Sequence, residues 1–108
     1  QDCAYIWNAH AASARAAGVP DDLVNALRDR KEMPAMADDE RAVVRFGQEN
    51  FRNHQVSRGA FQAVFELLGK QGAVELGLIF ANYCGLALMI NSFDVNLPPV
   101  RAEQLMPI

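Results

Sequence analysis

A thiol and an imidazole lie seven residues apart near the start of the chain, at Cys3 and His10. Residues 2–17 read DCAYIWNAHAASARAA, which predicts a helix on which Cys3, Ile6 and His10 share one face, bordered by Trp7. A partly buried imidazole on such an apolar face is suited to general acid–base chemistry. The alternative is a core histidine satisfied by a backbone carbonyl or a neighbouring carboxylate, and spacing alone favours this alternative.

A second group of candidates lies in the last third of the chain, at Glu75, Asn82 and Tyr83. Glu75 and Asn82 are seven residues apart, so on a helix they share a face, and burying them costs free energy unless they are hydrogen-bonded. They either line a pocket or subunit interface beside His10, or cap a neighbouring helix, and both interpretations stay open. Tyr83 is either a pocket wall or part of the core, and the core is favoured.

Signature motifs of several other chemistries are missing from the sequence. The stretch GKQG at 69–72 lacks the spacing and the following Ser or Thr of a phosphate-binding loop. No nucleophile elbow surrounds a serine, and no HExxH or CxxC pair offers zinc ligands. Cys84 is expected to behave as a small apolar residue, and His54 as an exposed loop residue. We therefore expect neither a metal nor a cofactor.

Composition limits the class of protein. The 108 residues are 51% hydrophobic and 21% charged, with a net charge of −3. These values suit one globular domain and exclude low-complexity and disordered chains. The mildly acidic balance argues against nucleic acid as a partner. The two cysteines lie at opposite ends of the chain and make no disulfide framework, so we expect a soluble, cytoplasmic protein.

The chain begins at Gln1 without an initiator methionine, and its first residues already resemble the interior of a helix. It has no positively charged, apolar signal region. We therefore expect a piece of a longer protein, whose upstream segment would be a further partner for any site.

Helical patterns account for most of the chain, because it is rich in Ala, Leu and Met and poor in alternating β-branched runs. The expected helices are residues 2–17, 20–31, 39–53, one opened by Ser57, and 72–92. Their boundaries are expected at Gly18, at an N-cap on Asp38 or Asp39, at an N-cap on Ser57, and at a turn marked by Gly69 and Gly72.

These elements predict an all-α fold: a compact bundle of about five helices in a domain at 1–95, with an extended tail at 96–108 favoured by Pro98-Pro99. The last helix is apolar on nearly all sides. Its cleanest run, Leu76–Ile90, contains Asn82 and falls short of the roughly 20 residues that a bilayer needs. We expect a buried central helix and no membrane span.

Two segments together resemble a known family. They are Tyr5-x-Trp7-x-x-His10 with Ala14 and Ala17-Gly18-Val19, and Val74-Glu75-Leu76 with Asn82-Tyr83, separated by DDERAVVRFGQE. Their order and spacing resemble the carboxymuconolactone decarboxylase / alkylhydroperoxidase-D-like family over residues 2–95. Members of that family are all-helical, typically form trimers or hexamers, and use a histidine at the position of His10 in proton transfer. Some decarboxylate lactone acids, and others are CxxC thiol peroxidases.

The match departs from the family pattern at one position. Cys3 falls where peroxidase members place their first cysteine, but the second would fall at Ile6, where other members commonly have Glu. Without a second thiol on the next turn, no intramolecular disulfide can close a peroxidase cycle. Without the carboxylate, His10 lacks a partner that could orient it. Peroxidase activity is therefore disfavoured.

The resemblance implies a small-molecule enzyme, decarboxylase or lyase in type, with His10 as general acid or base on a small carboxylic or lactone acid. Cys3 is a further catalytic candidate, and Trp7, Asn82 and Tyr83 are the substrate-binding candidates. The alternatives are an oxidoreductase that uses the Cys3 thiol, and a catalytically silent member. In each case a homo-oligomer, trimer or hexamer, is expected through the apolar last helix.

Overall fold

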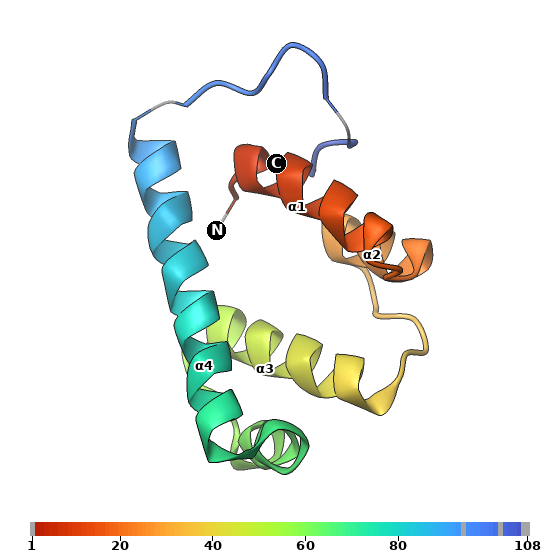
Figure 1. The fold of residues 1–108 in the computed structure, drawn as a ribbon, viewed down its shortest axis with the longest axis vertical. Coiled ribbons are helices and arrows are strands. Elements are labelled where there is room, and N and C mark those ends of the chain that lie inside the picture. The colour runs from red at the N-terminus through yellow and green to blue at the C-terminus, as the bar shows by residue number, and fades with distance from the viewer. Residues whose placement is uncertain (1, 94, 102, 107–108) are drawn as a thin grey trace. The chain divides into compact units, whose positions relative to one another are not determined.

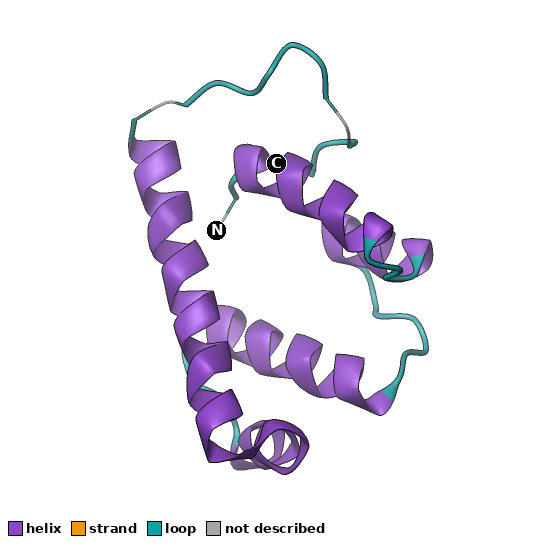
Figure 2. Cartoon of the chain, in the orientation of Figure 1, coloured by secondary structure: helices purple, strands orange, loops and turns teal. Residues whose placement is uncertain are grey.

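In the computed structural model, which describes residues 2–93, 95–101 and 103–106, the chain is helical with no strand among those residues (Figures 1 and 2). The helices are α1 (Ala4–Ala16), α2 (Asp21–Asp29), α3 (Asp38–Asn53) and α4 (Arg58–Ser92). The all-α prediction is therefore confirmed.

The element count is four where about five were expected, because α4 comprises two helical segments joined directly at a kink. Gly69 interrupts α4 with a φ of 72° and a ψ of −179°, a conformation that is essentially restricted to glycine. The turn expected at Gly69 is thus present as a sharp kink between the two helical segments of α4, without an intervening loop.

The helix ends are set by capping and turn residues close to them in the sequence. Gly18 (φ 89°) follows α1, and the Ser57 hydroxyl oxygen accepts the N–H of Ala60 at 3.2 Å at the start of α4, both as predicted. The N-cap of α3 is Ala37, one residue before the expected Asp38. The Ala37 N–H donates to Glu40 Oε2 at 3.3 Å, so the glutamate half of a capping box stabilises this end.

The chain forms two compact units, Gln1–Ala35 with Cys84–Ile108 (unit 1) and Met36–Tyr83 (unit 2), and α4 contributes to both. In unit 1, α1 packs against α2. Its buried apolar residues are small or aliphatic: Cys3, Ala11, Leu23, Val24, Ala26 and Ala87. The Asn91 amide in the last turn of α4 donates to the carbonyl of Asp2 at 3.2 Å, which ties that turn to the start of the chain.

Unit 2 has its own core between α3 and α4. The buried cluster comprises Ala42, Phe46, Val64 and Ala73, with Val56, Ala63, Leu76 and Phe80 packed against it. The Phe80 ring lies 6.0 Å from that of Phe46 and 5.6 Å, edge-on, from that of Phe51 (centroid distances). Gly47 makes this approach possible, because a Cβ there would lie 2.8 Å from Phe80 Cζ.

The prediction that the last helix is a buried central helix is wrong for this chain. Val74, Leu78 and Leu88 on α4 are 57%, 63% and 61% exposed. By length and composition alone, α4 would be able to cross a membrane. After the Gly69 kink, one face of α4 carries buried or half-buried residues, among them Ala73, Leu76, Phe80, Cys84 and Ala87, so an apolar surface remains on the other side.

Candidate functional site

The packed side of α1 is not the one that carries His10. Asn8 and Ala11 are buried, with Ala4 and Arg15 half-buried one turn to either side, whereas His10 is exposed. The burial that both sequence interpretations expected for His10 is therefore wrong, and its catalytic role stays a prediction. The physical reason is that an alanine-rich helix has no dominant apolar stripe, so the polar contacts of Asn8 and Arg15 decide which side packs.

Cys3 lies in a different environment from His10. Its thiol is free, the residue is 3% exposed, and it occupies the N-cap position of α1. A buried thiol is shielded from external oxidants and thiols. The structure thus places the two catalytic candidates at and on α1, with only the imidazole exposed to solvent.

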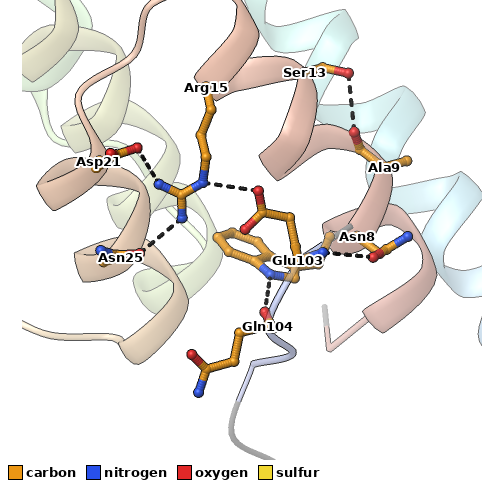
Figure 3. Close-up of polar contacts among 9 residues, drawn as sticks. Asn8, Ala9, Ser13, Arg15, Asp21, Asn25, Glu103 and Gln104 are labelled. Carbon is orange, nitrogen blue, oxygen red and sulfur yellow. Dashed lines mark hydrogen bonds and ion pairs between the residues drawn. The ribbon is translucent and has the colours of Figure 1, made fainter. Parts of the chain in front are cut away.

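Trp7 and Asn8 hold the C-terminal segment against α1, and Figure 3 shows Asn8 beside Glu103. The indole Nε1–H of Trp7 donates to the carbonyl oxygen of Gln104 at 2.9 Å, and the N–H of Glu103 donates to Asn8 Oδ1 at 3.2 Å. The tail has no helix or strand in its described residues, 95–101 and 103–106, as expected of an extended tail. Of the tail predicted at 96–108, residues 102, 107 and 108 lie outside the described part.

Arg15 is the centre of a polar cluster between α1, α2 and this segment (Figure 3). Its Nε donates to Glu103 Oε1 at 2.9 Å, Nη1 to Asp21 Oδ1 at 2.5 Å, and Nη2 to Asn25 Oδ1 at 2.9 Å. The hydrogen bond to Glu103, and then that to Asp21, raise the pKa of Arg15 above its ordinary value. The sequence reasoning missed Asn8, Arg15 and Glu103, since nothing in local periodicity links residues about 90 positions apart.

Asn82 and Tyr83, the other substrate-binding candidates, lie on α4 in unit 2 and are both exposed. Glu75 is exposed as well, and its Oε1 accepts a hydrogen bond from Gln71 Nε2 at 2.9 Å. The expectation that Glu75 and Asn82 share a buried face is therefore wrong, and so is the favoured placement of Tyr83 in a core. Of the five site candidates, the structure places Trp7 and His10 on α1 and Cys3 at its N-cap.

Unit 2 contains a second polar cluster, at the corner where α3 leads into α4. Glu49 accepts the N–H of Ser57 on Oε2 at 2.7 Å and the Nε–H of Arg45 on Oε1 at 2.8 Å. Hydrogen bonds from Ser57, and then the one from Arg45, lower the pKa of Glu49 to about 2. His54, exposed and in a left-handed conformation (φ 57°), ends α3 in this corner, in line with its predicted loop position.

The hydrogen bonds of Glu49 should make the free energy of unfolding depend on pH in the acid range. Because the folded-state pKa lies below the ordinary value of 4.5, Glu49 contributes stability above pH 4.5, and that contribution is lost as the pH falls towards about 2. We expect Glu49→Gln to lower the urea midpoint at pH 7, and the difference from wild type to shrink between pH 4.5 and pH 2. Glu66→Gln is the control, because that carboxylate lies within α4 and accepts an amide hydrogen bond from Gln62. A difference for Glu49→Gln that does not change with pH would contradict this account.

Among the described residues, no group of three or more His, Cys, Asp or Glu is arranged to hold a metal ion. No family model, no curated protein and no solved structure matches the chain. Among the chain's own side chains, the exposed imidazole of His10 on α1 is a group suited to proton transfer near neutral pH.

Proposed function

We propose that this chain is a small-molecule enzyme in which His10 acts as general acid or base on a small carboxylic or lactone acid. The observation that carries the proposal is the exposure of His10, which leaves the imidazole accessible to a substrate rather than enclosed in the core. Imidazole is the side chain best suited to exchanging protons near neutral pH. The resemblance of Tyr5-x-Trp7-x-x-His10 to the carboxymuconolactone decarboxylase / alkylhydroperoxidase-D-like family gives the substrate class.

The reaction we propose is a decarboxylation in which His10 supplies the proton. The bond between the substrate carbon and its carboxylate breaks, carbon dioxide leaves, and the electron pair stays on the carbon. The His10 imidazolium donates a proton to that carbon, and the neutral imidazole is protonated again from solvent. Trp7, half-buried and three residues from His10, contributes an aromatic wall one turn away.

Incubation of the wild-type chain with a panel of small lactone acids tests this proposal, with release of carbon dioxide as the readout. Turnover of at least one acid is the expected result. Absence of turnover across the panel, by a chain shown to be folded and assembled, would favour a catalytically silent member. The redox alternative predicts fast alkylation of Cys3 by iodoacetamide near neutral pH, which its 3% exposure does not favour.

We further propose that the enzyme is a homo-oligomer, in which a second copy covers α4. Six exposed positions of α4 follow a four–three spacing typical of helix–helix seams: Val74, Leu78, Ala81, Gly85, Leu88 and Ser92. The small residues at its middle allow close approach of a second helix. Glu75 and Asn82 lie beside the seam and are exposed, and their polar groups favour a protein partner over lipid.

Leu78→Lys is expected to weaken self-association by at least about tenfold, because it places a charge at the centre of an apolar seam. Sedimentation equilibrium over a concentration series measures this effect. Leu67→Lys is the matched control, since Leu67 is also exposed on α4 but lies before the Gly69 kink and off the seam. A wild-type chain that is monomeric at high concentration would refute the oligomer, and binding of that monomer to lipid vesicles would assign α4 to a membrane instead.

A further inference from the structure

The C-terminal segment, residues 103–106, is held on α1 in the way that proteins hold an extended peptide. Side chains of α1 bond to both kinds of backbone group at consecutive residues: Asn8 accepts the N–H of Glu103, and Trp7 donates to the carbonyl of Gln104. Asn8 is 8% exposed, so its side-chain oxygen is largely shielded from water. Backbone hydrogen bonds of this kind give affinity without depending on the side chains of the bound segment.

The Glu103 carboxylate supplies the side-chain contact that distinguishes this segment from other extended peptides. Its side chain is 10% exposed and forms an ion pair with Arg15. Asp21 and Asn25 hold the other two guanidinium nitrogens of Arg15, so this cation is oriented by the fold and not only by the tail. Arg28 adds a longer-range attraction for the same carboxylate. A preorganised arginine beside a tryptophan is the composition of a binding hot spot.

We propose that the side of α1 bearing Trp7, Asn8 and Arg15 is a binding site for an extended acidic peptide, occupied here by residues 103–106, and that the same segment of a second copy can take their place. Ten residues separate Ser92 from Glu103. Fully extended they span roughly 33 Å, which is enough to reach a neighbouring chain. Exchange of an identical segment between copies preserves every contact, so it costs little.

This site shares Trp7 with the proposed substrate wall, but its ion-pairing residue lies on a different side of α1 from the proposed catalytic group. Arg15 follows His10 by five residues, which places the two side chains about 140° apart around α1. Binding of the C-terminal segment is therefore testable whether or not His10 is catalytic. Trp7 is the one tryptophan in the chain, so its fluorescence reports directly on occupancy of the site.

The test uses the 108-residue chain carrying Glu103→Gln and a synthetic peptide of residues 95–108. We expect the substitution to shift Trp7 emission to the red and to increase its quenching by acrylamide, with helix content by circular dichroism unchanged. Titration with the peptide should reverse both effects. A peptide in which glutamine replaces the glutamate at position 103 should bind at least about tenfold more weakly, because it loses a charge-assisted hydrogen bond.

Glu32→Gln is the matched control, since Glu32 is an exposed glutamate of the same unit, and it should leave Trp7 emission unchanged. Equal Trp7 emission in the Glu103→Gln and wild-type chains would overturn the proposal, and so would binding of the two peptides within twofold of each other. If Glu103→Gln unfolds the chain, a nitroxide-labelled peptide in excess over the wild-type chain decides the question. Broadening of the Trp7 indole resonance would support exchange, and an unaffected resonance would overturn it.

Discussion

Replacement of His10 by glutamine is expected to lower kcat/KM for the lactone acid by about 10²–10⁴-fold, the usual contribution of a general acid or base. The physical reason is that glutamine fills a similar space but cannot donate a proton from a cationic form. His10 is exposed and lies outside both buried clusters, so the free energy of unfolding should change little. Steady-state kinetics together with a urea titration of the same samples separates these two effects.

His54→Asn provides the control for loss of an exposed histidine. His54 has a positive φ, and asparagine tolerates that backbone conformation better than most residues. Its activity should match that of the wild-type chain. Added imidazole should restore part of the activity of a His10→Ala variant, which a purely structural role would not allow. Undiminished turnover by His10→Gln would remove His10 from the mechanism.

The fold class was predictable from the sequence because helical signals are local. Gly18 and Ser57 lie at the helix ends they were expected to mark, and the N-cap of α3 at Ala37 differs from the expected Asp38 by one residue. Gly69 shows the same local logic: its positive φ breaks the helical geometry of α4 where the turn was expected, so two helical segments meet there at a kink.

The candidate site was predictable only in part. Trp7 and His10 lie on one helix as expected, but Cys3 lies just before it at the N-cap, and the side of the helix that packs was misjudged. That side depends on Arg15 and on its ion pair with Glu103, two residues 88 positions apart in the chain. No periodicity within a single helix contains information about such a contact.

The burial of α4 was misjudged for a different reason. A helix that is apolar on nearly all sides is expected to be buried, and this rule applies to a protein together with any partner that covers it, not to one chain alone. In the single chain only the side with Ala73, Phe80 and Ala87 is covered to any extent, and Leu78 on the other side remains 63% exposed. The same apolar pattern therefore predicts an interface as readily as a core.

Within unit 2, removal of the Phe80 ring should have the largest effect on stability. Phe80→Ala is expected to lower the free energy of unfolding by about 3 kcal/mol, near the lower end for a phenylalanine, because the ring is half-buried between Phe46 and Phe51. Gly47→Ala is expected to cost about 1–2 kcal/mol, since the new Cβ would lie 2.8 Å from a ring that its neighbours hold in place. Urea unfolding measures both.

The double variant gives the sharper test, because both substitutions change the packing at the contact between Gly47 and the Phe80 ring. Without the Phe80 ring, the methyl group of Gly47→Ala meets no obstacle and gains the helix preference of alanine, so the double variant should be more stable than the sum of the single losses predicts by about 1 kcal/mol or more. Gly77→Ala is the control, since a Cβ at Gly77 has nothing within 4 Å, and it should combine additively with Phe80→Ala. Strict additivity of Gly47→Ala with Phe80→Ala would show that α3 and α4 do not approach each other at this point in solution.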